Sequence, residues 1–305
     1  MPSEFELIQR HFSRPTRHTL LGVGDDAALL RPDAGAEMAV STDMLLEGRH
    51  FAKGAEPRLL GHKALAVNLS DMAAMGATPR WATLALALPE ADEAWLGAFA
   101  AGFHALAERY EVDLIGGDTT RGPLAICVTI LGEVPAGLAL MRGGARPGDD
   151  IWVSGELGGA GLALKGGGSN AVARRLHQPE PRVELGERLR GIAHAAIDVS
   201  DGFAQDLGHI LERSSTGALV HYALLPKVAC GDAALQQRCV LGGGDDYELV
   251  FTAPQSARRE IEALSAALRL PLTQVGSIQP GEPKLQVLDA RGKPLAVPRG
   301  YDHFA

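Results

Sequence analysis

The chain has 305 residues, of which 46% are hydrophobic and 22% are charged, and its formal net charge is −8. These values are typical of a globular protein with one large or two ordinary domains. The negative charge argues against a nucleic-acid backbone or an anionic membrane as the main partner, although a metal cation can still join acidic side chains to a phosphorylated ligand.

The cysteines and the N-terminal segment indicate the cellular compartment of the protein. Cys127, Cys230 and Cys239 lie far apart without a CxxC pair, a pattern typical of reduced, buried thiols. The first twelve residues, MPSEFELIQRHF, have no apolar signal region, and no window approaches the ~20 apolar residues of a membrane span. We therefore expect a cytoplasmic protein with neither a membrane nor a nucleic acid as partner.

The first part of the chain alternates between helical and strand patterns. Helices are predicted over residues 4–12, 60–75 and 90–110. Strands are predicted over residues 38–43, 81–88, 112–115 and 124–134. Asp92 is placed to cap the helix at 93–110.

A Pro-Gly turn at 146–150 precedes a second alternation. We place a boundary just before it and expect domains at 1–137 and 138–305. The second part predicts strands over 151–155, 195–199, 218–223, 247–252 and 284–288, helices over 184–194, 203–213 and 256–268, and a glycine-rich loop over 158–168. The pattern indicates an α/β or α+β class in two parts.

Acidic turns are the most informative feature of the sequence. Five segments place small residues before one or two aspartates: GVGDDAAL, AVSTDML, LIGGDTT, AIDVSDG and GGGDDYEL. Asp43, Asp118, Asp198 and Asp201 directly follow apolar, strand-like runs, and ligand clefts form at the strand ends of α/β sheets. Neighbouring glycines let the backbone approach a ligand and leave N–H groups open to phosphate oxygens.

Asp71 lies inside an otherwise apolar helix, ALAVNLSDMAAM, where an unpaired buried carboxylate is costly. If several of these acids converge, two carboxylates ~4 Å apart repel by about 4 kcal/mol at an effective dielectric of about 20. Oxygen ligands without a His/Cys set favour Mg²⁺. The alternative is ordinary turn and cap chemistry, in which Asp201 caps the helix at 203–213. The pattern alone does not decide between the two interpretations.

Several common nucleotide-binding signatures are absent. The chain has no GxxxxGK[ST] loop, no HRD or DFG segment and no GxGxxG fingerprint. If the chain binds ATP, it therefore does so with residues outside these known motifs.

Eight segments resemble those of the thiamine-monophosphate kinase family, in the family's order and over nearly the whole chain. They are GVGDDAALL, STDMLLEGRHF, KALAVNLSDMAAMGATP, LIGGDTTRGPL, ARPGDDIWVSG, AIDVSDGFAQDLGHI, GGGDDYELVF and GYDHF. The resemblance implies a two-domain, aminoimidazole ribonucleotide synthetase-like fold. It also implies a homodimer whose N-terminal sheets pair into a barrel, with ATP and several Mg²⁺ ions bound in a cleft.

The resemblance also implies roles for individual residues. The metal shell would comprise Asp26, Ser41, Thr42, Asp43, Asp71, Asp118, Asp198 and Asp201. ATP would contact Gly117, Asp118, Arg142 and Ser200, and thiamine monophosphate would contact His50, Glu248 and Tyr301. The chain departs from the family at Asp245, where a glutamate is common.

The implied reaction moves the γ-phosphate of ATP to a phosphate acceptor. Asp43, Asp71 and Asp118 would act through Mg²⁺, and an acceptor phosphate that is already ionised needs no general base. Arg142, His50, Tyr301 and Glu248 each also have a purely structural interpretation. Two other functions remain open: another ATP-dependent synthetase of the same superfamily, and a non-catalytic nucleotide or metal sensor.

Overall fold

The computed structural model describes residues 4–298, 300 and 301. It shows a mixed α/β chain that divides into two compact units, each with its own sheet. The first unit comprises the residues up to Met72 together with Ala77–Gly137. The second comprises Ala73–Gly76 and the residues from Leu138 onward.

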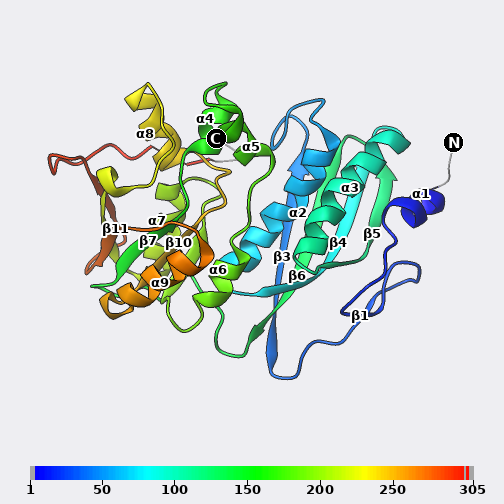
Figure 1. The fold of residues 1–305 in the computed structure, drawn as a ribbon, viewed down its shortest axis with the longest axis horizontal. Helices are drawn as coiled ribbons and strands as arrows, with labels where there is room; N and C mark the ends of the chain where they lie inside the picture. The colour runs from blue at the N-terminus through cyan, green and yellow to red at the C-terminus, as the bar shows by residue number, and fades with distance from the viewer. Residues whose placement is uncertain (1–3, 299, 302–305) are drawn as a thin grey trace. The chain divides into compact units, whose positions relative to one another are not determined.

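A four-stranded sheet forms the centre of the first unit (Figure 1). Its strands, in spatial order, are β3 (Ala36–Leu46), β6 (Ala125–Pro135), β4 (Thr78–Leu88) and β5 (Asp113–Arg121). Strands β4 and β5 are parallel, and the other neighbours are antiparallel. Helices α2 (Pro57–Ala74) and α3 (Glu93–Arg109) cover one face. On the β5 side lie α1 (Glu4–His11) and the ribbon of β1 (Thr19–Leu21) and β2 (Leu29–Leu30).

Glycines let the backbones of α2 and α3 approach each other closely. A Cβ atom at Gly61 would lie 2.0 Å from the carbonyl oxygen of Phe99, and one at Gly102 would lie 1.9 Å from that of Arg58. Only glycine fits at these two contacts. The close packing buries most of α2, and it places Asp71, near the end of that helix, beside the sheet.

The start of α3 confirms the predicted cap. The Asp92 carboxylate accepts the N–H groups of Ala94 and Trp95 at 2.9 and 3.0 Å. These are two of the N–H groups that a helix leaves without an internal partner.

A six-stranded sheet forms the centre of the second unit. Its strands, in spatial order, are β12 (Leu285–Leu288), β9 (Gly217–His221), β11 (Leu272–Gln279), β7 (Asp150–Ser154), β10 (Leu249–Ala253) and β8 (Ala195–Asp198). The helices are α4 (Gly159–Leu164), α5 (Asn170–His177), α6 (Val183–Arg188), α7 (Phe203–Ser214), α8 (Ala233–Gly242) and α9 (Arg258–Leu268), with short 3₁₀ turns η1 (Tyr222–Leu224) and η2 (Gln255–Ala257). Every residue of β7, β8 and β10 is buried.

Two strands continue past the acids that were expected at strand ends. Asp43 lies inside β3, opposite Val128, and Asp118 lies inside β5, opposite Ala85. Pairing with a neighbouring strand outweighs the polar composition that suggested an end at these positions. Asp198, by contrast, is the last residue of its strand, as expected.

Other differences concern the second unit. The helix expected at 184–194 ends at Arg188, and α5, α8 and β11 were not predicted. The glycine-rich segment at 158–168, expected as a loop, contains α4. The Asp246 carboxylate accepts the N–H groups of Gly158 and Ala160 at 2.6 and 3.2 Å, at the start of this helix. A capping group that comes from far along the chain is invisible in the local pattern.

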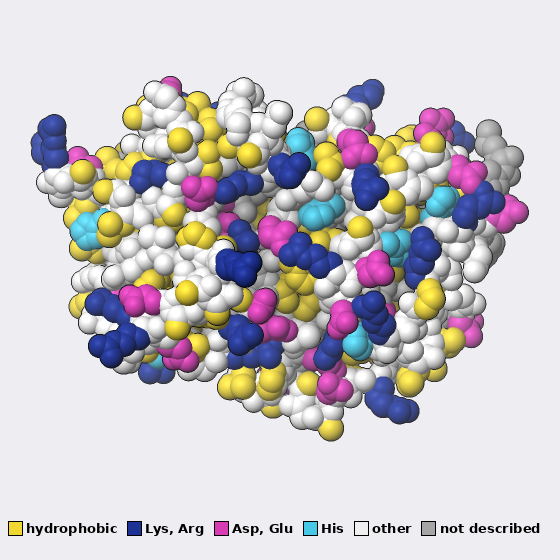
Figure 2. All heavy atoms as spheres, viewed as in Figure 1, with side chains coloured by type: hydrophobic (Ala, Val, Ile, Leu, Met, Phe, Trp, Pro, Cys, Tyr) yellow, Lys and Arg dark blue, Asp and Glu magenta, His cyan; other side chains and the backbone are white. Residues whose placement is uncertain are grey.

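The surface carries both signs of charge. On the face shown in Figure 2, acidic and basic side chains are interspersed, and no broad area is of one sign. Among the described residues, no helix combines the length and the apolar character needed to cross a bilayer.

Candidate active site

Asp43 on β3 and Asp71 on α2 form a pair of neighbouring carboxylates. Ser41 lies two residues before Asp43 and therefore on the same face of β3. Its hydroxyl donates to Asp71 Oδ2 at 2.5 Å. This hydrogen bond joins the acid of the helix to the strand face that carries Asp43.

Burial and the nearby charge of Asp71 raise the pKa of Asp43 to about 7. Burial is the larger cause, because it disfavours the charged form, and the like charge of Asp71 acts in the same direction. The pair is therefore costly to keep fully ionised. A divalent cation bound between the two groups would remove this cost.

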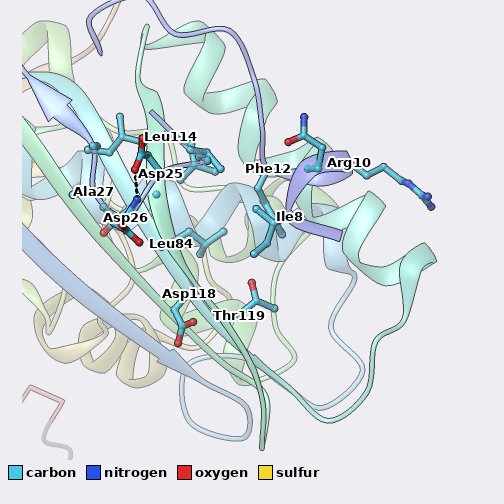
Figure 3. Close-up of a pocket in the computed structure, with 18 of the residues that line it drawn as sticks. Ile8, Arg10, Phe12, Asp25, Asp26, Ala27, Leu84, Leu114, Asp118 and Thr119 are labelled. Atoms are coloured by element: carbon cyan, nitrogen blue, oxygen red, sulfur yellow. Dashed lines mark hydrogen bonds between the residues drawn. The ribbon is translucent and has the colours of Figure 1, made fainter. Parts of the chain in front are cut away.

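A pocket of about 1120 Å³ lies on the β5 side of the first unit (Figure 3). Its acidic lining residues are Glu6, Asp25, Asp26 and Asp118, and its apolar lining residues include Ile8, Phe12, Leu84 and Leu114. Arg10 is the basic side chain among the described lining residues, and it extends away from the other labelled side chains (Figure 3). An anionic ligand would enter this pocket only with a cation, because acids outnumber bases in the lining.

Two adjacent glycines form part of the pocket wall. Gly117 has φ +151°, and a Cβ atom there would lie 1.8 Å from the carbonyl oxygen of Leu84. Glycine is therefore required at this position. A Cβ atom at Gly116 would have no neighbour within 4 Å. The wall at Gly116 thus faces open space, where a ligand can approach the backbone.

The first unit does not bring all its predicted metal ligands together. The Thr42 side chain lies on the opposite face of β3 from Asp43, and its hydroxyl is 2.8 Å from that of Thr129. Asp118 lies on β5, at the other edge of the sheet from β3. Three strand spacings of about 4.8 Å separate the edges, or about 14 Å. Asp118 is therefore grouped with Asp26 in the pocket lining and not with Asp43.

The segment after β8 carries the predicted residues of the second unit. Asp198 is buried at the strand end, and Ser200 and Asp201 are half-buried in the turn that follows. Asp201 Oδ2 accepts the side-chain N–H of Gln205 at 3.2 Å. The backbone N–H of Tyr301 donates to the Asp201 carbonyl at 3.0 Å, while the Tyr301 side chain stays 40% exposed. Tyr301 is thereby placed beside this turn.

The alternative role of Asp201, as the cap of α7, is wrong. The residue at the N-cap is Gly202, with φ +123°. The N–H groups of Asp201 and Gly202 instead donate to Asp206, one turn into the helix, at 3.1 and 3.0 Å.

Glu248 is buried in an ion pair. Arg182 donates to both of its carboxylate oxygens, at 2.7 and 2.5 Å, and the Ser154 hydroxyl donates at 2.6 Å. A Cβ atom at Gly155 would lie 2.0 Å from Glu248 Oε1, so the carboxylate rests directly on this glycine. The predicted contact of Glu248 with a substrate stays a prediction, and any such contact would compete with these bonds.

The last two predicted residues lie in turns. His50 follows β3, and its Nδ1 accepts the N–H of Leu46 at 3.0 Å. Arg142 is exposed in the second unit, where its carbonyl accepts the Ser214 hydroxyl at 3.0 Å.

The chain matches two family models, described as "AIR synthase related protein, N-terminal domain" over residues 24–134 and "AIR synthase related protein, C-terminal domain" over residues 146–287. It is 45% identical to the thiamine-monophosphate kinase of Salmonella typhimurium, over 99% of this chain and 98% of the relative. It is 35% identical to that of Bacillus subtilis, over 99% of both chains. This chain belongs to the thiamine-monophosphate kinase family.

Solved structures of the family share the fold. A thiamine-monophosphate kinase from Stenotrophomonas maltophilia is 46% identical, with a TM-score of 0.86 over 95% of this chain and 96% of that one. AaThiL, complexed with AMPPCP and TMP, is 29% identical, with a TM-score of 0.77 over 98% and 96%. The hydrogenase maturation protein HypE, in complex with ATP, is 24% identical with a TM-score of 0.79, which indicates a common fold only.

The carboxylates of the first unit can be compared with what a Mg²⁺ ion would need. Within the described part of the chain, no three His, Cys, Asp or Glu side chains lie close enough to hold a metal ion by themselves. Mg²⁺, however, typically takes one or two carboxylates and completes its shell with substrate phosphates and water. The pair of Asp43 and Asp71, with its raised Asp43 pKa, is such a partial set.

The sequence pattern singled out the acidic segment that contains Asp246 but not Asp113 or Asp206, and all three aspartates hold turns of this kinase-family chain in place. Asp206 and Asp246 accept backbone N–H groups as described above. Asp113, buried at the start of β5, accepts the N–H groups of Arg17 and His18 and the hydroxyl of Thr19, at 2.7 to 3.0 Å.

Proposed function

We propose that this chain transfers the γ-phosphoryl group of ATP to thiamine monophosphate and releases thiamine diphosphate and ADP. One observation carries the proposal: the chain is 44–45% identical, over nearly its whole length, to curated thiamine-monophosphate kinases. The complex of AaThiL with AMPPCP and TMP supports the same pair of ligands.

We assign the metal shell to Asp26, Ser41, Thr42, Asp43, Asp71, Asp118, Asp198 and Asp201. Bound Mg²⁺ would neutralise phosphate charge and let two polyanions approach each other. Asp43 and Asp71 would provide a paired carboxylate contact, and the Ser41 hydroxyl keeps Asp71 in place for it. The Thr42 hydroxyl lies on the opposite face of β3 from Asp43. If Thr42 binds a metal ion there, it would do so through its main-chain carbonyl oxygen.

We assign ATP to the acid-lined pocket and to Gly117, Asp118, Arg142 and Ser200. The open space beside Gly116 lets a ligand reach the backbone of the wall. The Arg142 guanidinium would add a fixed positive fork for the phosphates. The apolar patch of Leu84 and Leu114 would suit the base of the nucleotide.

We assign thiamine monophosphate to His50, Glu248 and Tyr301. The exposed Tyr301 ring lies beside the Asp201 turn and would stack on the flat, cationic thiamine rings. The acceptor phosphate is ionised near neutral pH, so this chain needs no side chain to remove a proton from it.

A homodimer also belongs to the proposal. Alternate residues of β3 form an exposed apolar row on the face away from the helices, in which Met38 is 38%, Val40 60%, Met44 54% and Leu46 37% exposed. A second copy of this chain, with its own sheet, would cover this row.

The cytoplasm is the location we propose. All three cysteines are present as thiols, and reduced cysteines are usual in that compartment.

The assay uses the purified chain with Mg²⁺, ATP and either thiamine monophosphate or thiamine. We expect one thiamine diphosphate per ADP with the monophosphate, and no transfer to thiamine. ADP formation without thiamine diphosphate would favour a different synthetase of the same fold. ATP binding without turnover would indicate a sensor.

A further inference from the structure

Asp206 holds the turn that carries Ser200 and Asp201. Its Oδ2 accepts the backbone N–H groups of Asp201 and Gly202 at 3.1 and 3.0 Å, and the backbone of Ser200 also hydrogen-bonds to this carboxylate. Asp206 is 2% exposed. One buried carboxylate therefore binds three successive residues of the turn.

Other contacts hold the same turn from outside. The N–H of Asp245 donates to the Ser200 carbonyl at 2.9 Å, and the N–H of Tyr301 donates to the Asp201 carbonyl at 3.0 Å. A Cβ atom at Gly202 would lie 2.8 Å from the backbone of Gly242, so the turn also packs against the end of α8. The main chain of the turn is therefore held on both sides.

This arrangement decides which groups a ligand can reach. The N–H groups of Asp201 and Gly202 point inward to Asp206, so they are not donors for a phosphate, contrary to the use that the glycine-flanked sequence suggested. The Ser200 hydroxyl and the Asp201 carboxylate, whose Oδ2 also accepts the side-chain N–H of Gln205 at 3.2 Å, are the polar side-chain groups that the turn offers to a ligand.

We propose that Asp206 is a positioning residue for the nucleotide side of the site, acting through the backbone of the Ser200–Asp201 turn. The inference rests on the proposed function for the roles of Ser200 with ATP and of Asp201 with Mg²⁺. Asp206 itself touches neither ligand. Its role is to aim the Ser200 hydroxyl and the Asp201 carboxylate in a fixed direction.

Asp149 offers a matched control in the same unit. It is 3% exposed, its carboxylate accepts the backbone N–H of Arg146 at 2.9 Å, and it pairs with His194 at 2.8 Å. Its loss should destabilise the second unit as much as the loss of Asp206, without touching the Ser200–Asp201 turn.

The experiment compares the wild type, Asp206→Ala and Asp149→Ala by calorimetric titration with Mg²⁺ and AMPPCP, with thermal unfolding recorded in parallel. Alanine removes both acceptor oxygens, whereas asparagine would keep one. We expect binding to be weakened at least roughly tenfold in Asp206→Ala, and to stay within about twofold of the wild type in Asp149→Ala. In Asp206→Ala the KM for thiamine monophosphate should rise less than the KM for ATP, because Tyr301 contacts the turn through the Asp201 carbonyl and not through an N–H that Asp206 holds. Binding unchanged in Asp206→Ala, or weakened equally in both variants, would overturn the proposal.

Two further features keep the test decisive. Titration measures binding and needs no turnover. If the wild type binds AMPPCP but forms no thiamine diphosphate, the proposed function is refuted. The role of Asp206 in binding is still tested in that case. If Asp206→Ala does not fold, hydrogen exchange of the wild type decides: the amides of Asp201 and Gly202 should exchange at least roughly 100-fold more slowly than those of an exposed loop. Fast exchange at both amides would show that Asp206 does not hold the turn.

Discussion

The Ser41 hydroxyl joins Asp71 to the face of β3 that carries Asp43, and the pKa of Asp43 rises to about 7 through burial and the charge of Asp71. Two half-buried acids from different elements thus lie close together. Their mutual repulsion is the physical reason to expect a cation there.

Asp43→Asn, Asp71→Asn and Asp118→Asn should each reduce phosphoryl transfer by roughly 10³-fold, because each removes a charged ligand for the metal. The variants should stay folded, and they should lose part of the rise in melting temperature that Mg²⁺ and AMPPCP give the wild type. Glu90→Gln, which changes an exposed acid of the same unit, is the control. Normal turnover in all three variants would refute the assignment.

Gly116→Leu should fill the pocket without disturbing the fold, because a side chain at this position begins in open space. We expect the KM for ATP to rise roughly tenfold or more, while the KM for thiamine monophosphate changes little. Gly122→Leu lies just past the end of β5 and away from the pocket lining, and it should behave like the wild type. An unchanged KM for ATP in Gly116→Leu would place the nucleotide elsewhere.

Two variants distinguish a residue that contacts the substrate from one that forms a structural ion pair: Tyr301→Ala tests the contact, and Glu248→Gln tests the ion pair. Tyr301→Ala should raise the KM for thiamine monophosphate more than that for ATP, because the exposed ring is lost and the backbone contacts stay. Glu248→Gln should lower stability by roughly 3 kcal/mol, since it removes the charged carboxylate that accepts two hydrogen bonds from Arg182. If Glu248→Gln raises the KM for thiamine monophosphate and Arg182→Gln does not, Glu248 contacts the substrate directly.

Asp246 should make stability depend on pH. Burial raises its pKa from 3.8 to about 7, so the folded chain holds this proton more tightly than the unfolded chain does. Its contribution to stability is therefore present at low pH and is lost as the pH rises toward about 7. The stability of Asp246→Asn relative to the wild type should increase by roughly 2 kcal/mol between about pH 5 and about pH 8.

Denaturant unfolding of the second unit measures this difference, and Asp232→Asn is the control. Hydrogen bonds from the N–H groups of Leu235 and Ala234 lower the pKa of Asp232, so its titration lies below this pH range. The difference between Asp232→Asn and the wild type should therefore stay constant. A constant difference for Asp246→Asn as well would show that its carboxyl titrates normally.

Val40→Asp should disrupt the proposed dimer, because it places a charge in the exposed apolar row of β3. We expect light scattering to give the mass of one chain for this variant and of two chains for the wild type. Leu164→Asp changes an equally exposed leucine of the second unit and should leave the mass unchanged. A wild type that is monomeric at all concentrations tested would exclude this part of the proposal.

The sequence predicted the elements whose signal is local. The helix around Asp71 and the cap at Asp92 follow from composition and from short-range hydrogen bonding. The extensions of β3 and β5 past Asp43 and Asp118 depend on neighbouring strands, which local polarity does not reveal. The helix in the glycine-rich segment depends on Asp246, almost ninety residues later in the chain.

The same distinction applies to the site. Asp71 was singled out as an acid in an apolar helix and Asp43 as an acid that follows a strand-like run; the structure places the two carboxylates near each other, and their role as metal ligands stays a prediction. The separation of Asp118 from that pair follows from the strand order, with β3 and β5 at opposite edges, which no sequence pattern specified. The ion pair of Glu248 with Arg182 was missed because the two residues are distant in sequence.

Anomalous diffraction from crystals grown with Mn²⁺, AMPPCP and thiamine monophosphate would test the central claim most directly. We expect manganese peaks within bonding distance of Asp43, Asp71 and Asp118 and of the phosphate oxygens of both ligands. Ligands bound with no manganese at these carboxylates would contradict the account.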